Sequence, residues 1–239
     1  TVAPTAIPTT LNVAENGTAV GTLTATDSSN VNWALDGTGA DDTKFNLSST
    51  GVLTLKAAKD YETPDSAAGT NAYVIKVKAT DAVGNTTTQA VAVNVTNVNE
   101  APVNTVPGAQ STLEDTAKVI TGLSIGDVDA GTSNVTTTLA VTNGTLAVFV
   151  GSTGFASVDT NNSASVTLTG TVAQINATLA AANGVTFNPT LNFNGSATLT
   201  MTTNDGGFTG TGGALTDTDT VAITVTAVND APTLTTAGA

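Results

Sequence analysis

Residues 93–102 read VNVTNVNEAP, and residues 223–232 read ITVTAVNDAP. In both stretches a strand-like alternation of apolar and polar residues leads into Asn, an acidic residue, Ala and Pro. Pro102 and Pro232 are 130 residues apart, which is the length of one ordinary domain. The repeat therefore predicts two tandem modules, residues 1–102 and residues 103–239.

Period-2 alternation predicts antiparallel strands throughout both modules. Within residues 72–79, for example, Tyr73, Ile75 and Val77 would face one side of a sheet while Lys76 and Lys78 face the other. The strands expected in the first module are 19–25, 31–35, 51–55, 72–79 and 86–96. Those expected in the second are 118–125, 135–141, 146–149, 164–168, 186–188, 197–203 and 220–228. Short strands separated by polar turns predict an all-β fold of two tandem antiparallel Greek-key β-sandwiches.

Two segments of the second module break this alternation. Val172, Ile175 and Leu179 recur at helical spacing and Gly184 follows as a stop, so residues 171–182 are expected to form a short crossover helix. The glycine-rich stretch 205–213 is expected to form a long hairpin loop.

The composition limits the possible partners and ions. The chain has 19 acidic and 6 basic residues, a net charge of −13, and neither Cys nor His. Such a chain neutralises phosphates poorly, so nucleic acid is excluded as a partner, and no segment predicts direct membrane insertion. Disulfides are excluded, and zinc or copper sites are disfavoured, while hard cations with oxygen ligands remain compatible.

Most acidic residues lie in or beside turns. In the first module these are Glu15, Asp27, Asp60, Glu62, Asp81 and Glu100; in the second they are Glu114, Asp115, Asp127, Asp129, Asp205, Asp217, Asp219 and Asp230. Because strands alternate in direction, Asp127, Asp129 and Asp205 should gather at one end of their module. Calcium binds about six to eight oxygens from carboxylates, amides and backbone carbonyls, so such turn clusters predict calcium sites.

The first module resembles cadherin repeats over nearly its full length. The resemblance rests on AENG at Glu15, KDYE at Asp60 and Glu62, ATDAVGN at Asp81, and the linker NVNEAP at Asn97, Asn99 and Glu100. The sequence departs from the family at Asn97 and Glu100, which replace aspartates. The family's Asp-x-Asp pair is also only half present, because Asp27 is followed by Ser28 and Ser29.

The second module resembles the same repeats at its joints. GDVDAG matches Asp-x-Asp at Asp127 and Asp129, and TNDGG contains Asp205. The helix and the long loop make this module more similar to the immunoglobulin-like repeats of giant bacterial adhesins, including the repeats-in-toxin class exported by type I secretion.

These resemblances imply a calcium-binding structural segment of a large bacterial adhesin, located extracellularly at the cell surface. Calcium would stiffen the joint between neighbouring repeats and extend the molecule for cell adhesion and biofilm formation. The chain would be a fragment of a longer array. The implied metal ligands are Glu15, Asp27, Asp60, Glu62, Asp81, Asn97, Asn99, Glu100, Glu114, Asp115, Asp127, Asp129, Asp205, Asp217, Asp219, Asn229 and Asp230.

Other readings remain open at this point. The chain could be a module that binds surface glycans or another copy of itself, with calcium supporting the fold, or an accessory module of a secreted hydrolase. Trp33 shares a strand face with Val31 and Leu35, which favours a core position over a sugar-stacking one. Catalysis by the chain itself is not expected, because His is absent and the carboxylates lie in turns at the ends of the modules.

Overall fold

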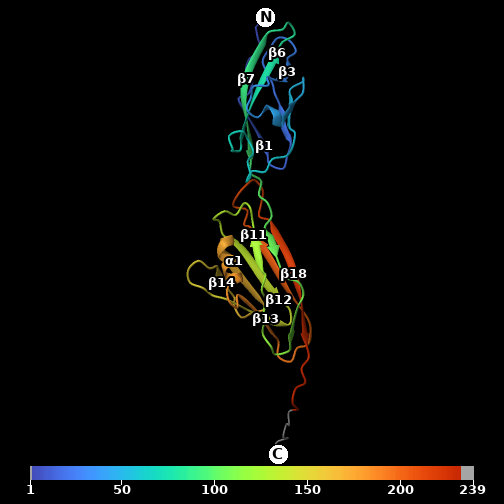
Figure 1. The fold of residues 1–239 in the computed structure, drawn as a ribbon, viewed down its shortest axis with the longest axis vertical. Helices are drawn as coiled ribbons and strands as arrows, with labels where there is room; N and C mark the ends of the chain where they lie inside the picture. Colours follow the sequence, from blue (N-terminus) through green and yellow to red (C-terminus); the bar gives the residue numbers. More distant parts are fainter. Residues whose placement is uncertain (1, 233–239) are drawn as a thin grey trace, which may run out of the picture. The chain divides into compact units, whose positions relative to one another are not determined.

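The computed structural model describes residues 2–232 of the chain. The chain divides into two compact units, of which the first ends at Val98 and the second begins at Asn99. We call them unit 1 and unit 2. Both are built from strands, and unit 2 also contains an α-helix (Figure 1). The all-β fold expected from the alternation of the sequence is therefore confirmed.

Unit 1 is a sandwich of two sheets. Its elements are β1 (Thr10–Ala14), β2 (Ala19–Thr22), β3 (Asn32–Leu35), the 3-10 helix η1 (Asp42–Lys44), β4 (Phe45–Leu47), β5 (Val52–Leu55), β6 (Ala72–Thr80) and β7 (Thr86–Thr96). One sheet has the order β1-β7-β6-β3 and the other β2-β5-β4. Strands β6 and β7 pair antiparallel, whereas β1 lies parallel to β7.

The core of unit 1 comes from the inward-facing residues of these strands. Tyr73, Ile75 and Val77 are completely buried, as the alternation of β6 predicts. Trp33 is also buried, with 5% of its surface exposed, so its predicted core position is confirmed. Phe45 and Tyr73 meet edge to face, with ring centroids 6.2 Å apart, a favourable arrangement for two aromatic rings.

Unit 2 contains more strands than unit 1, and it also contains a helix. Its elements are β8 (Val103–Thr105), β9 (Gln110–Leu113), β10 (Lys118–Val119), β11 (Ser124–Gly126), β12 (Val135–Val141), β13 (Gly144–Val148), β14 (Ser157–Asp159), β15 (Ser165–Gly170), α1 (Val172–Ala180), β16 (Val185–Pro189), β17 (Gly195–Asn204) and β18 (Thr216–Thr226). The largest sheet has the order β14-β15-β12-β17-β18-β9, and smaller sheets have the orders β10-β16-β13 and β11-β8. Strand β9 lies parallel to β18, as β1 does to β7.

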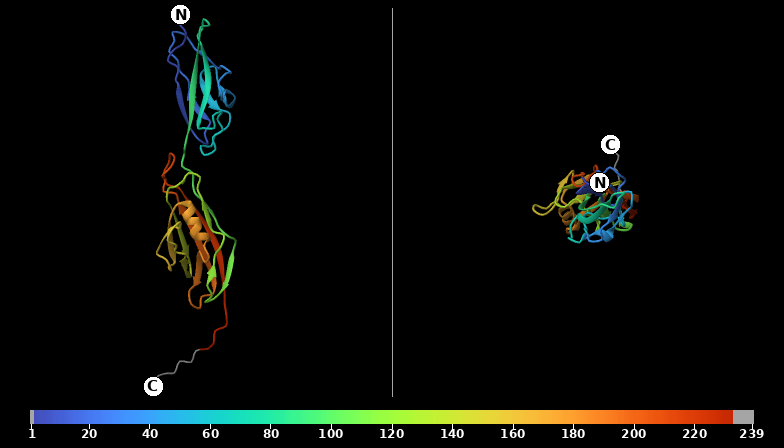
Figure 2. Two further views of the ribbon diagram at one scale, coloured as in Figure 1. Left: turned by 60° about the vertical axis from the view of Figure 1, so that its left-hand side comes forward. Right: turned by 90° about the horizontal axis from the view of Figure 1, so that it is seen from above.

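The predicted helix is present, and it packs against the core of unit 2. Thr171 and Gln174 form a capping box at its N-terminus, and Ile175 and Leu179 are buried in the core of unit 2. Asn176 accepts a hydrogen bond from Ile125 N and donates one to Ile125 O, both at 2.8 Å, which ties the helix to β11. Figure 2 shows α1 lying against the strands of unit 2.

Two differences from the predicted strands have local causes. The segment expected as one strand, 118–125, is interrupted at Gly122, whose φ of 82° is incompatible with a continuous strand. Strand β18 begins at Thr216 rather than at Thr220, because its first residues pair with β17 as far as Asn204. The residues between β17 and β18 form the expected long loop.

Candidate metal centre

Glu15 is the central carboxylate at one end of unit 1. It lies in a tight turn after β1, where Asn16 adopts a φ of 60° and Gly17 N donates to Ala14 O. Only 4% of Glu15 is exposed. Its Oε1 accepts a hydrogen bond from Val98 N at 2.7 Å, and its Oε2 accepts one from Tyr61 N at 2.8 Å. Glu15 thus holds the loop after β5 and the segment after β7 together.

The loop after β5 brings two further carboxylates to this end. Asp60 Oδ1 accepts hydrogen bonds from Glu62 N and Thr63 N, and hydrogen bonding from the Thr63 side chain and backbone lowers the pKa of Asp60. Glu62 Oε1 accepts a hydrogen bond from Asn97 Nδ2 at 2.9 Å, and a carboxylate oxygen of Glu62 lies within 4.8 Å of one of Glu15. We call Glu15, Asp60, Glu62 and Asn97 the unit 1 cluster.

Asp127 is the key residue of a second cluster, in unit 2. Its Oδ1 accepts hydrogen bonds from Asp129 N at 2.9 Å and Ala130 N at 3.0 Å. Its Oδ2 is buried and has no hydrogen-bond partner within residues 2–232. Burial raises the pKa of Asp127, and the negative charges of Asp205 and Asp129 raise it further, against the lowering effect of the two backbone donors. A cation would stabilise ionised Asp127, because one of its carboxylate oxygens is buried without a hydrogen-bond partner and other negative charges lie nearby.

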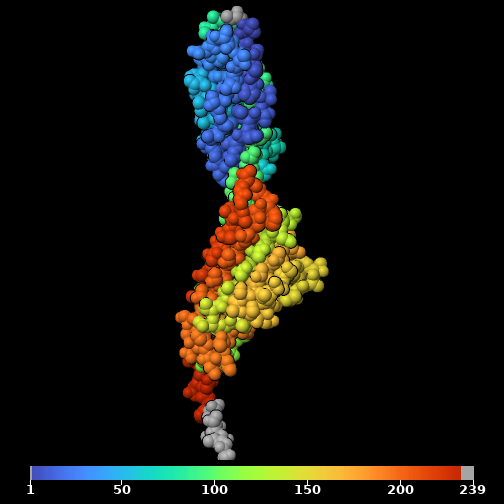
Figure 3. All heavy atoms as spheres, turned by 180° about the vertical axis from the view of Figure 1, so that it is seen from behind, coloured from blue at the N-terminus to red at the C-terminus, as the bar shows by residue number. Residues whose placement is uncertain are grey.

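Asp129 and Asp205 complete this cluster. Asp205 is buried, and its Oδ1 accepts hydrogen bonds from Gly207 N and Leu215 N. Its Oδ2 accepts one from Asn99 Nδ2 at 2.7 Å, and Asp129 Oδ2 accepts one from Glu100 N at 2.6 Å. We call Asp127, Asp129, Asp205 and Asn99 the unit 2 cluster. The loop between β17 and β18, orange-red in Figure 3, covers this end of unit 2.

A hollow of about 330 Å³ lies beside Asp127 and is lined by Glu100, Ala101, Val103, Gly126, Asp127 and Val128. Carboxylate and amide oxygens are the donors that calcium prefers, and both clusters supply them from several loops. The residues therefore fit a hard divalent cation.

Asp27 and Asp81 lie near each other at another place in unit 1. Donors from their own loops form hydrogen bonds to both carboxylates. Asp27 Oδ1 accepts hydrogen bonds from the backbone N and the hydroxyl of Ser29, each at 2.7 Å. The Ser29 hydroxyl in turn accepts one from Ala82 N. Asp81 Oδ2 accepts a hydrogen bond from Asn85 Nδ2 at 2.7 Å.

Four further candidates lie at the end of unit 2 where β18 finishes. Glu114 is buried, and its Oε1 accepts a hydrogen bond from Val228 N at 2.5 Å. Asp115 is exposed, and its Oδ1 accepts one from Asn192 N. Asn229 and Asp230 are exposed beyond β18.

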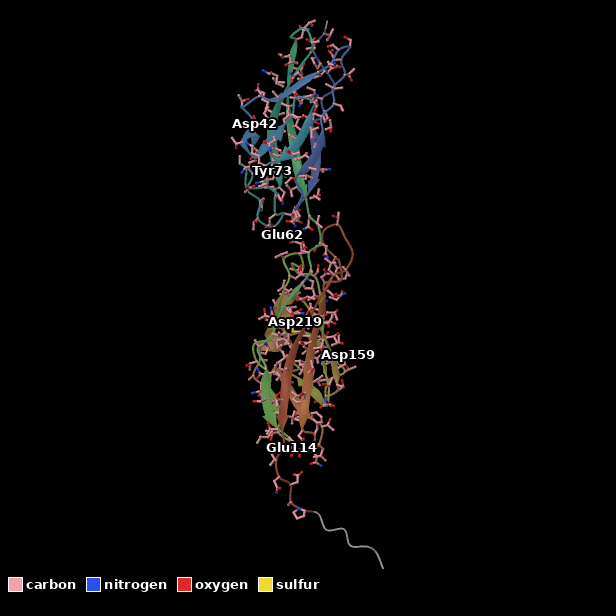
Figure 4. The ribbon with its side chains drawn as sticks, turned by 90° about the vertical axis from the view of Figure 1, so that its right-hand side faces the viewer. Asp42, Glu62, Tyr73, Glu114, Asp159 and Asp219 are labelled. Atoms are coloured by element: carbon pink, nitrogen blue, oxygen red, sulfur yellow. The ribbon has the colours of Figure 1, made fainter. Side chains whose placement is uncertain are left out.

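The last two candidates, Asp217 and Asp219, lie on a strand rather than in a turn. Both belong to β18, opposite Thr203 and Met201 of β17. Asp217 Oδ2 accepts a hydrogen bond from Asn104 N at 2.7 Å. Figure 4 places Asp219 well along unit 2 from Glu114. The structure does not bring this pair into either cluster.

The sequence-based candidate set omits two buried carboxylates of unit 1, Asp41 and Asp42. Asp41 accepts backbone hydrogen bonds from Ala67 and Val74. Asp42 Oδ2 accepts from Gly37 N and Gly39 N, and its Oδ1 accepts from Lys76 N. Backbone donors thus occupy both oxygens of each residue, which makes them structural anchors. Asp42 lies away from Glu62 in Figure 4.

Comparison with known proteins supports the fold. No protein-family model matches the chain, and no curated protein matches it. Human protocadherin-24 EC1-2 is similar in structure, with a TM-score of 0.52, 18% sequence identity, and coverage of 96% of this chain and 100% of that one. The chain therefore has a cadherin-like fold of two tandem β-sandwiches.

More distant similarity extends to longer cadherin structures. Drosophila N-cadherin EC1-4 matches with a TM-score of 0.47, 18% identity, and coverage of 95% of this chain and 50% of that one. Protocadherin gamma B2 extracellular cadherin domains 3-6 match with a TM-score of 0.44, 19% identity, and coverage of 95% and 47%. The chain spans about half the length of these two structures.

The structure also bears on the glycan-binding alternative. Trp33 is buried, so it presents no ring face for stacking on a sugar, and Phe193 is partly buried against the core of unit 2. Phe208, in the loop before β18, is 69% exposed. Within residues 2–232, no helix is long and apolar enough to span a bilayer.

Proposed function

We propose that the chain is a calcium-binding structural segment of an extracellular adhesion protein, in which bound calcium stiffens the connection between unit 1 and unit 2. One observation carries this proposal. The unit 1 cluster is anchored to Val98 through Glu15, and the unit 2 cluster is anchored to Asn99 through Asp205. Val98 and Asn99 are consecutive residues, so a single peptide bond joins the segments that the two clusters hold.

The electrostatics support calcium at these clusters. Each cluster carries three carboxylates, and the chain as a whole has a net charge of −13. Without a cation, repulsion within each cluster opposes its compact arrangement. Asn97 and Asn99 now donate through Nδ2 to Glu62 and Asp205. Rotating each amide by half a turn would present Oδ1 to a cation, so the same residues serve with and without the ion.

The cadherin-like fold supports an extracellular role, because the similar structures are of extracellular cadherin domains. We further propose that the parent protein is a large bacterial surface adhesin of the type I secreted class, and that the partners are neighbouring repeats or copies of the same chain. The composition rich in Thr, Asn and Gly and poor in Arg supports this assignment.

The proposal predicts a calcium-dependent rise in stability and order. At a calcium concentration about 100 times the dissociation constant, one independent site adds about 2.7 kcal/mol to the free energy of unfolding. For a domain of the size of unit 1 or unit 2, this gain in free energy corresponds to a rise in Tm of about 10 °C. Small-angle scattering should also show a narrower distribution of molecular dimensions in calcium than in EGTA.

Calorimetry and scattering on the same sample, in calcium and then in EGTA, test this prediction. Magnesium at the same concentration is the control, because it carries the same charge and gives the same ionic strength. Its stricter octahedral geometry suits these loops less well, so a smaller response is expected. If calcium changes neither the Tm nor the scattering profile, the proposed function is wrong.

A further inference from the structure

Strand β8 connects the linker to the body of unit 2, and its inward-facing residue is polar. The strand is three residues long and directly follows residues 99–102. Val103 and Thr105 point outward and are exposed, whereas Asn104 points inward and only 8% of its surface is exposed. Burying an amide is unfavourable unless its polar groups are hydrogen bonded, so the contacts of Asn104 decide how β8 is held.

The hydrogen bonds of Asn104 connect β8 to two strands of the largest sheet. Its Nδ2 donates to Asp217 O at 2.9 Å and to Met201 O at 3.3 Å. Its backbone N donates to Asp217 Oδ2 at 2.7 Å, and its Oδ1 accepts from Thr203 Oγ1 at 2.6 Å. Because Thr203 of β17 and Asp217 of β18 lie opposite each other, one residue of β8 bridges both strands.

A second buried hydroxyl completes this set of contacts. Thr137 and Thr203 are completely buried, and their hydroxyl oxygens lie 3.0 Å apart. A hydroxyl has one proton to donate, and Thr203 gives it to Asn104, so Thr137 is the donor to Thr203. We call Asn104, Thr137, Thr203 and Asp217 the Asn104 network.

Burial alone does not fix the register of β8. Pro102 and Val106 lie on the same side as Asn104, and they are buried and partly buried. A slip by one residue would turn this side outward, so burial excludes it. A slip by two residues keeps the same side inward and brings Pro102 or Val106 beside Thr203. Neither side chain can accept the Thr203 proton, and Pro102 also lacks a backbone N–H for Asp217.

We propose that the Asn104 network specifies the register of β8 and thereby positions the linker on unit 2 before any ion binds. A slip by two residues would move the chain by roughly 6.8 Å along the strand. That distance would separate Glu100 N from Asp129 Oδ2, which it contacts at 2.6 Å. Fixing a register at some cost in stability is the best-attested role of a buried polar residue. Asn104 and Thr203 are therefore positioning residues.

An apolar version of the network separates register from stability. The variant combines Asn104→Leu, Thr137→Val and Thr203→Val, which keep nearly the same side-chain shapes. The Tm of unit 2 is expected to stay the same or to rise, because well-packed apolar groups can replace a buried polar network without loss of stability. The single register of β8 is expected to be lost.

Nuclear magnetic resonance in EGTA measures the register directly. In the unmodified chain Val103 lies opposite Gly126, and Thr105 lies opposite Ser124. In the apolar variant, contacts between Val103 and Ser124, or between Thr105 and Gly126, should appear beside these. The amide of Glu100 should exchange with water at least about tenfold faster, because a strand without a fixed register opens locally more often.

Two matched variants serve as controls. Thr105→Val makes the same type of change at the exposed neighbour of Asn104, and Thr203→Ser keeps the hydroxyl that donates to Asn104. Both should retain one register and the slow exchange of Glu100. An apolar variant that keeps the single register and the slow Glu100 exchange would overturn the inference, whatever its Tm.

If the apolar variant does not fold, Thr203→Val alone provides the test. It removes one hydrogen bond from Asn104 and should give the slipped contacts at a lower population. A single register in this folded variant would equally overturn the inference. All of these measurements are made without calcium, so their outcome is independent of the proposed calcium binding.

Discussion

Replacing Asp42 with alanine is expected to destabilise unit 1 by about 4 kcal/mol. The carboxylate accepts three backbone hydrogen bonds, from Gly37, Gly39 and Lys76, at 2.9 to 3.0 Å. Hydrogen bonds to a charged group contribute about 1.5–3 kcal/mol each, and a buried donor left without a partner costs about 1–3 kcal/mol. The total is held below the sum of these values because the loop can relax and admit water. A loss of this size is a large fraction of the stability of an ordinary domain.

The chain contains a built-in reporter for this measurement. Trp33 is the single tryptophan and is buried in unit 1, so its fluorescence follows the urea unfolding of that unit. Asp42→Asn keeps one acceptor oxygen and should fall between the alanine variant and the unmodified chain. Asp36→Asn, at a nearby half-buried carboxylate that pairs with Lys76 Nζ at 3.2 Å, should lower the urea midpoint much less than Asp42→Ala, because that ion pair is partly open to solvent. An alanine variant that unfolds at the same urea concentration as the unmodified chain would contradict the prediction.

Asp127→Asn is expected to change the stability of unit 2 in opposite directions with and without calcium. In EGTA the variant should melt at a higher temperature, because it removes a desolvated charge that faces Asp129 and Asp205. The amide oxygen can still accept from Asp129 N and Ala130 N, as Asp127 Oδ1 does. In saturating calcium the variant should lose most of the roughly 10 °C gain expected for the unmodified chain.

The sign of the pH dependence follows from the raised pKa of Asp127. The folded unit holds this proton more tightly than the unfolded chain, whose carboxyl has the ordinary value of 3.8. The resulting stabilisation is fully present below pH 3.8 and is lost as the pH rises through the folded-state pKa. In EGTA, the advantage of Asp127→Asn over the unmodified chain should therefore grow as the pH is raised from about 4 toward 7.

Calorimetry in calcium and in EGTA, at two pH values, measures the difference in melting temperature between Asp127→Asn and the unmodified chain. Asp159→Asn, on the exposed strand β14, removes the same charge away from the cluster and should reproduce the calcium response of the unmodified chain. A variant with an undiminished calcium gain would show that Asp127 is not a ligand.

The strands were predictable where one face of a strand is buried. Strands β7 and β12 have the predicted bounds, 86–96 and 135–141, because their alternation between core and solvent is regular. Strands β1 and β9 were not predicted, and neither were their parallel pairings with β7 and β18. These short strands gain their order from a neighbour far along the chain, which local periodicity does not reveal.

For the candidate site, too, the sequence identified the acidic turns but not the distant backbone groups that bind some of the carboxylates. The motifs around Asp127 and Asp205 identify acidic turns, and the structure gathers both residues into one cluster with Asn99. The acidic pair Asp41 and Asp42 looks similar in sequence, yet it binds backbone amides of β6 more than 30 positions away. Whether a turn carboxylate is free for an ion depends on such distant donors.

The parallel pairing of the last strand with a strand near the start of each unit also determines how the unit carries mechanical load. In unit 1, Thr10 lies opposite Ala92 and Ala14 opposite Thr96, so the chain enters beside one end of this pairing and leaves at the other. Tension on the chain pulls β1 and β7 along their length in opposite directions. Their backbone hydrogen bonds are then loaded together, in shear, and do not open one at a time as in a peeled hairpin. In unit 2 the short strand β8, paired with β11, precedes β9, and β9 then pairs parallel with β18. Tension along β9 and β18 therefore also loads their hydrogen bonds in shear.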